Sequence, residues 1–213
     1  MKLLFGGALV LALAGCASVP TAGLSGAELV SAQAAQQARA AAVGLEHGDC
    51  GTPSWVMTGR VALSNGKQGG SGQIEWTQGQ GQLRLILTTP VTRQGWLLEA
   101  DASSATLQNL SDGATRQNID ASRLLQDATG WDVPLSALGC WMRGIEANPA
   151  QYGVAQLRYG ADALPQQLVQ NGWVIRYERW QQDPFSHQWM PSRMEAVRGN
   201  DHVRLIVDRW GLE

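Results

Sequence analysis

The reactive group that stands out in this sequence is the thiol of Cys16, which follows Leu13, Ala14 and Gly15. A thiol can be converted to a stable thioether, and small side chains before it leave the backbone open to a peptidase. The fifteen preceding residues carry one positive side chain, Lys2, and an apolar run shorter than the roughly 20 residues that a membrane-spanning helix needs. This arrangement is typical of a secretory signal. We therefore expect residues 1–15 to be removed and Cys16 to become the N-terminus.

The segment from Leu13 to Cys16 resembles the lipobox of bacterial lipoproteins. The resemblance implies a covalent lipid on the Cys16 thiol and a further acyl chain on its amine, and several acyl chains anchor a protein far more durably than one. The alternative is an ordinary signal peptide with a chance cysteine. Ala17 is not Asp, which in lipoproteins favours the outer membrane over the inner one. We expect a lipid-anchored protein on the outer membrane that faces the periplasm.

The rest of the chain fits one domain. Residues 16–24 are expected to form the lipidated N-terminus and tether, and residues 25–213 a single domain. The net charge of −2 argues against a nucleic-acid partner, because phosphate binding needs a clustered positive excess. We expect a monomer that binds no nucleic acid.

No convincing catalytic set is present in the sequence. There is no H-E-x-x-H or G-x-S-x-G motif, and the three histidines have no obvious metal-ligand spacing. The carboxylates fit strand ends, caps and surface positions. We therefore predict no enzymatic activity, no metal and no cofactor apart from the covalent lipid. Cys50 and Cys140 are either a disulfide, which the periplasm permits, or two separate thiols.

The apolar pattern predicts a mainly β domain. An Ala-rich helix should run from a capping box at Ser25 to about Val43 and pack shallowly. Further helices are expected at 120–129 and 134–143. Period-two alternation between turn residues indicates strands near 55–64, 71–77, 82–88, 94–101, 104–110, 114–118, 153–159, 164–170, 172–180, 192–198 and 202–210.

So many antiparallel strands must curl or close, because long open sheets twist and expose their edges. We expect an incompletely closed antiparallel β-barrel of about ten or eleven strands, with an apolar cavity covered by short helices. The nine tryptophans fit either an ordinary core or the wall of a cavity for acyl chains.

Several segments, in order, resemble the LolB family of outer-membrane lipoprotein receptors. They are 58–62, 72–76, 83–90, 129–135, 138–144, 171–177, 190–194 and 203–210. The resemblance implies a half-open barrel with a helical lid that accepts lipoproteins from the periplasmic carrier LolA. The acyl chains of the lipoprotein cargo would enter the cavity and then pass into the inner leaflet of the outer membrane.

The family also implies a protruding loop with an exposed apolar residue that assists membrane delivery. Here it corresponds to residues 90–95, with Val91 where the family typically has the larger Leu. Candidate cavity residues are taken from the strands and the lid helices, and they are Ile74, Trp76, Leu85, Leu87, Trp96, Leu98, Leu125, Leu138 and Trp141. Two other classes remain as alternatives: a scaffolding outer-membrane lipoprotein without acyl-chain binding, and a lipoprotein hydrolase.

Overall fold

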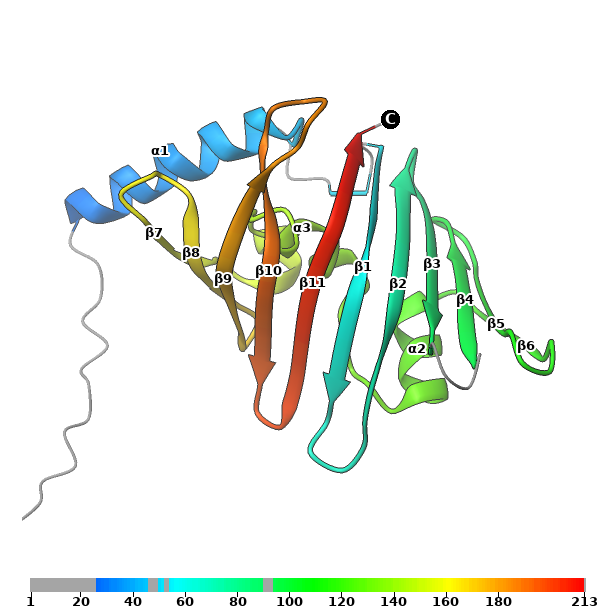
Figure 1. Ribbon diagram of the computed structural model, residues 1–213. Coiled ribbons are helices and arrows are strands. Elements are labelled where there is room, and N and C mark those ends of the chain that lie inside the picture. Colours follow the sequence, from blue (N-terminus) through cyan, green and yellow to red (C-terminus); the bar gives the residue numbers. More distant parts are fainter. Residues whose placement is uncertain (1–25, 46–49, 52–53, 90–93, 213) are drawn as a thin grey trace, which may run out of the picture.

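The computed structural model describes residues 26–45, 50–51, 54–89 and 94–212 (Figure 1). The expected signal peptide, Cys16, the tether at 16–24, Ser25 of the capping box and Val91 lie outside these residues. Within the described part of the chain, no helix has the length and hydrophobicity needed to cross a membrane.

Eleven antiparallel strands form one sheet, in the order β6-β5-β4-β3-β2-β1-β11-β10-β9-β8-β7. The first and last strands of the chain, β1 and β11, pair at the centre, and β6 and β7 are the edges, so the sheet does not close into a barrel. The predicted fold class is confirmed. The strands are β1 (Trp55–Ser64), β2 (Gly69–Gly79), β3 (Gln82–Thr88), β4 (Gly95–Ala100), β5 (Ala105–Asn109), β6 (Thr115–Asn118), β7 (Gln156–Tyr159), β8 (Pro165–Gln170), β9 (Trp173–Gln182), β10 (Trp189–Arg198) and β11 (Asp201–Leu212).

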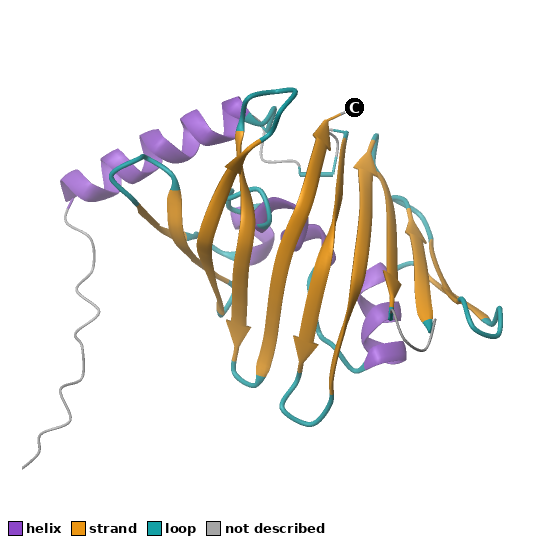
Figure 2. Cartoon of the chain, viewed as in Figure 1, coloured by secondary structure: helices purple, strands orange, loops and turns teal. Residues whose placement is uncertain are grey.

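The described helices are α1 (Gly26–Ala42), α2 (Ala121–Thr129), α3 (Leu135–Trp141) and the single turn α4 (Pro149–Tyr152). Helices α2 and α3 lie behind the sheet in the view of Figures 1 and 2, whereas α1 runs along the end of the sheet near β7. Asp120 begins α2 as predicted, because its carboxylate accepts hydrogen bonds from the backbone N–H groups of Ser122 and Arg123. Gly130 ends it in a left-handed conformation.

Strand alternation places the core on the face that the helices cover. Trp55, Met57, Gly59 and Val61 of β1 are buried, while Val56, Thr58 and Arg60 between them are half-buried or exposed. Trp55 packs against Trp76 and Trp210, with ring centroids 5.5 and 5.6 Å apart. These three tryptophan rings therefore form one buried cluster in the core.

Some element boundaries differ from those predicted. Strand β2 starts at Gly69 rather than at 71, because Asn65 closes a tight turn by accepting hydrogen bonds from the N–H groups of Lys67 and Gln68. Strand β10 starts at Trp189 rather than at 192. Helix α4 was not predicted, because one helical turn has no apolar periodicity to detect, although Asn148 and Pro149 are suitable N-cap and N1 residues.

A substitution at Gly59 measures how closely the central strands β1 and β11 are packed. It follows a β-bulge in the β1–β11 register, and a Cβ there would collide with the carbonyl oxygen of Ile206. We expect Gly59→Ala to lower the free energy of unfolding by about 1–3 kcal/mol in urea titrations. Gly70→Ala is the matched control, because its nearest neighbour would be the Trp131 ring at 3.8 Å. Equal losses in both variants would contradict the steric explanation.

Candidate functional site: an apolar cavity beneath the helices

A cavity lies between the helix-covered face of the sheet and helices α2 and α3. Every lining side chain is aliphatic, aromatic or a thioether, so the wall carries no charged group. Its volume is about 50 Å³. The lining residues are Val61, Leu63, Ile74, Trp76, Leu85, Leu87, Leu125, Trp131, Val133, Leu135, Leu138, Trp141, Met142, Ile175, Met194, Ala196, Val203 and Leu205.

A more open groove of about 290 Å³ adjoins this cavity and is lined by residues at the ends of β1 to β4 together with Ala128 and Trp131. Four residues line both spaces: Val61, Leu63, Leu87 and Trp131. Three of these belong to the sheet, and Trp131 belongs to the connection between α2 and α3. Trp131 is therefore the one shared residue that belongs to the cover and not to the sheet.

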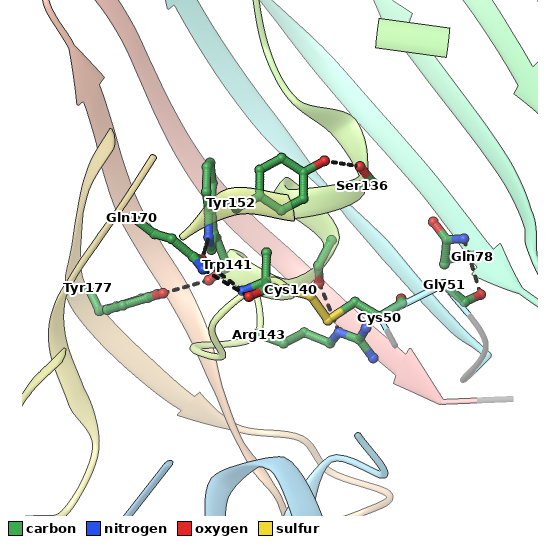
Figure 3. The surroundings of a disulfide bond; sticks show 12 residues. Cys50, Gly51, Gln78, Ser136, Cys140, Trp141, Arg143, Tyr152, Gln170 and Tyr177 are labelled. Atoms are coloured by element: carbon green, nitrogen blue, oxygen red, sulfur yellow. Dashed lines mark hydrogen bonds between the residues drawn. A yellow bond between two sulfur atoms is a disulfide. The ribbon is translucent and has the colours of Figure 1, made fainter. Parts of the chain in front are cut away.

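Helix α3 is fixed to the rest of the molecule at several points (Figure 3). A disulfide joins Cys140 to Cys50, with Cα atoms 5.2 Å apart. Of the two possibilities that the sequence left open, a disulfide and two separate thiols, the structure has the disulfide. The Arg143 guanidinium donates to the Cys50 carbonyl oxygen at 2.8 Å, and the Tyr177 hydroxyl donates to the Trp141 carbonyl oxygen at 2.7 Å.

Two further contacts complete the support of this helix. The Trp141 indole N–H donates to Gln170 Oε1 at 2.8 Å. From α1, the buried guanidinium of Arg39 donates to the Arg143 carbonyl oxygen at 3.0 and 2.9 Å and lies 5.0 Å from the centre of the Trp180 ring. Burial lowers the pKa of Arg39 from 12.5 to about 10. The group therefore stays protonated near neutral pH and keeps α1 joined to α3.

Helix α2 and residues 130–134 are held differently. Leu124 and Leu125 bury the inner side of α2. The following connection is held at its surface, where Arg198 Nη2 donates to the Asp132 carboxylate at 2.6 Å and to its carbonyl oxygen at 2.9 Å. Asn65 Nδ2 donates to the Gly130 carbonyl oxygen at 3.3 Å. Exposed ion pairs of this kind contribute little stability. Helix α3, by contrast, is joined to the rest of the molecule by a covalent link.

The structure places the sequence-predicted cavity residues in three locations. Seven line the cavity, and Trp96 lines the adjoining groove. Leu98 is in the hydrophobic core and lines neither space, because α2 packs beside β4 and β5 and fills that part of the sheet. The seven are Ile74, Trp76, Leu85, Leu87, Leu125, Leu138 and Trp141.

Sequence reasoning missed the lining residues on β1, β9, β10 and β11. The alternation pattern did indicate which of these residues share a face. Val203 and Leu205 lie on one face of β11, and Met194 and Ala196 lie on one face of β10. What the pattern did not contain was the pairing of β1 with β11, which brings these strands to the same wall. Thr89 and Gln94, which flank the residues around Val91, line the groove. Among the described residues, no group of His, Cys, Asp and Glu is arranged to hold a metal ion.

The fold and cavity define a class of protein: a half-open antiparallel sheet wrapped around an apolar space under short helices. A crystal structure of a DUF1329 family protein from Desulfovibrio piger shares this fold, with a TM-score of 0.52, 8% identity, and coverage of 85% of this chain and 93% of that one. At this identity the likeness shows the fold alone.

Sequence comparison identifies the family. The family model "Outer membrane lipoprotein LolB" matches residues 53–210. The "Outer-membrane lipoprotein LolB" of Xanthomonas campestris pv. campestris (strain B100) is 35% identical over 202 residues, covering 94% of this chain and 91% of that protein. That of Xanthomonas euvesicatoria pv. vesicatoria (strain 85-10) is 36% identical over 212 residues, covering 98% and 95%. The chain belongs to the LolB family.

Membership of this family also establishes the cellular location of the protein. It is a lipid-anchored outer-membrane lipoprotein of the lipoprotein-localisation pathway, as its sequence predicted. The family is known for localisation and transport rather than for enzymatic activity.

Proposed function

We propose that the protein receives lipoproteins from the periplasmic carrier LolA, holds their acyl chains in the apolar cavity, and releases them into the inner leaflet of the outer membrane. It does so as a monomer anchored by a lipid on Cys16. The observation that carries the proposal is the wholly apolar wall between the sheet and helices α2 and α3. Such a wall suits a ligand that offers hydrocarbon and no polar group.

The cavity must enlarge before it can hold an acyl chain. Its volume of about 50 Å³ is far below the roughly 300–1,000 Å³ of ordinary ligand sites. The adjoining groove of about 290 Å³ becomes continuous with it if the Trp131 ring moves aside. We infer that α2 and residues 130–134 swing outward while α3, held by its disulfide and hydrogen bonds, remains in place. No ATP is needed at this step. Transfer has a direction because the affinity for acyl chains rises from the carrier to this protein, and from this protein to the bilayer.

A transfer assay tests this function. A version without residues 1–15 and with Cys16→Ala is mixed with carrier loaded with a lipoprotein, and then with liposomes. We expect the cargo to move onto the protein and onward to the liposomes. A small cavity also suits a scaffolding lipoprotein that binds no acyl chain, and a folded protein that accepts no cargo would favour that function instead.

Val91 is proposed to act at the release step, and its described neighbours in the sequence, Thr89 and Gln94, line the groove. We expect Val91→Glu to leave acceptance from the carrier intact and to reduce release to liposomes about tenfold, because a carboxylate is costly to insert among lipids. Cargo sedimenting with liposomes measures release. Val30→Glu is the control, since Val30 is an exposed valine on α1. Unchanged release with Val91→Glu would reject the role.

A further inference from the structure

The turn between β9 and β10 carries two exposed aromatic side chains. Phe185 is 82% exposed and Trp189, the first residue of β10, is 48% exposed. The turn extends beyond the end of the sheet, next to the C-terminal end of α1 (Figure 1). The proposed carriage of acyl chains makes no use of either side chain, because neither lines the cavity or the groove. We refer to residues 183–189 as the aromatic tip.

Hydrogen bonds hold the aromatic tip in one shape. The buried Asp183 carboxylate accepts from the Ser186 N–H at 2.7 Å and from the Ser186 hydroxyl at 2.6 Å. Asp183 N–H donates to the Gln188 carbonyl oxygen at 2.8 Å, and His187 N–H donates to the Asp183 carbonyl oxygen at 2.9 Å. The Phe185 ring therefore projects from an ordered turn into water. Exposure of an apolar ring to water is unfavourable, and contact with an apolar environment relieves it.

The chemistry of the tip fits the interfacial region of a bilayer. Between Pro184 and Trp189 the residues are aromatic or polar, with no Asp, Glu, Lys or Arg. Tryptophan is enriched where membranes meet water, since its ring is apolar and its N–H is polar. A protein partner normally covers about 800 Å² of each surface, far more than one ring and half of another. One protruding ring needs no complementary pocket to enter lipid.

The lipid anchor allows the tip to reach a membrane. Arg39 of α1 donates to the Met190 sulfur at 3.4 Å, so α1 packs beside the base of the tip. Nine residues lie between Cys16 and Gly26, where α1 begins, and the ten Cα-to-Cα steps from Cys16 to Gly26 span at most about 33–36 Å. Helix α1 itself has 17 residues and a length of roughly 25 Å. A bilayer that holds Cys16 is therefore within range of Phe185.

We propose that the aromatic tip inserts Phe185 and Trp189 into the interfacial region of the bilayer to which the protein is anchored. Strands β9 and β3 are antiparallel across the sheet, so the tip and the C-terminal end of β3 lie at opposite ends. With the tip in the membrane, the groove near Thr89 faces the periplasm. On the proposed function, this is the orientation for receiving cargo, and release requires the molecule to turn over on its tether.

The sequence offers a direct probe, because Phe185 is the only phenylalanine after residue 15. The version without residues 1–15 and with Cys16→Ala is labelled with 4-fluorophenylalanine and mixed with phosphatidylethanolamine–phosphatidylglycerol vesicles. We expect nitroxide-labelled lipid to broaden the single fluorine signal. The double variant Phe185→Ser/Val154→Phe moves the probe to a position whose valine is 81% exposed, near the start of β7 at the other end of the sheet. Its signal should stay sharp.

Vesicle binding supplies the second measurement. We expect Phe185→Ser to lower the partition coefficient about tenfold and Val154→Ser to leave it unchanged. An unbroadened Phe185 signal, or equal binding by both variants, would overturn the proposal. A signal that responds to added carrier and not to vesicles would also overturn it and would indicate a protein-docking site. Neither cargo nor carrier is needed for vesicle binding, so the result is independent of the transfer assay.

Discussion

Loss of the Cys50–Cys140 bridge should lower the free energy of unfolding by about 4–5 kcal/mol, and the transfer of lipoproteins proposed above should persist at moderate temperature. The two cysteines are 90 residues apart in sequence. In the chain-entropy description, a cross-link over a loop of that length restricts the unfolded chain by about this amount. The effect acts chiefly on the unfolded state, so the folded structure need not change.

Transfer should survive because α3 has other supports. The Tyr177 hydroxyl still bonds to the Trp141 carbonyl oxygen, and Trp141 still bonds to Gln170. Arg39 still joins α1 to the Arg143 carbonyl oxygen. These contacts hold one side of the cavity in place without a covalent link.

Urea unfolding of the Cys50→Ser/Cys140→Ser variant measures the stability, and the transfer assay measures the function. Dithiothreitol should destabilise the unaltered protein to a similar degree and leave the variant unaffected, which separates loss of the bridge from the effect of burying serine. If the folded variant no longer accepts cargo, the bridge sets the position of α3 rather than only its stability.

Local pattern predicted most of the strands because each shows alternation between turn residues. The turn after β1 and the start of β10 were misplaced by a few residues, since both depend on hydrogen bonds that alternation does not encode. The Asn65 turn and the long β9–β10 hairpin are of this kind. Helix α2 was predicted well because Asp120 and Gly130 are strong start and stop residues.

The site was less predictable than the strands, because a cavity depends on which element covers which part of the sheet. Trp96 and Leu98 share a face of β4, yet Trp96 borders the groove and Leu98 is in the core beside α2. Val203 and Leu205 reach the cavity wall through the pairing of β11 with β1. The Cys50–Cys140 bridge likewise depends on a contact over 90 residues that neither cysteine reveals by its neighbours.

Leu138→Glu should reduce acyl-chain binding about 100-fold or more, equivalent to about 2.7 kcal/mol, with little loss of folding stability. Leu138 lines the cavity from α3 but is only half-buried, so the introduced carboxylate can stay hydrated while the cavity is empty. An acyl chain would strip that water away, and a carboxylate that loses its water without gaining a partner is strongly destabilised.

Binding of a fluorescent fatty acyl probe and transfer from the carrier measure this effect. Leu83→Glu is the matched control, because Leu83 is also half-buried but borders a polar groove with Arg84, Glu99 and Thr106. The introduced carboxylate in the cavity should have a raised pKa when acyl chains surround it, because burial favours the neutral form. As the pH falls through that pKa the charge is lost, so binding by Leu138→Glu should recover at acidic pH and binding by Leu83→Glu should not change. Equal binding by both variants at neutral pH would mean that acyl chains do not occupy the space under α3, and the apolar cavity would then belong to the core alone.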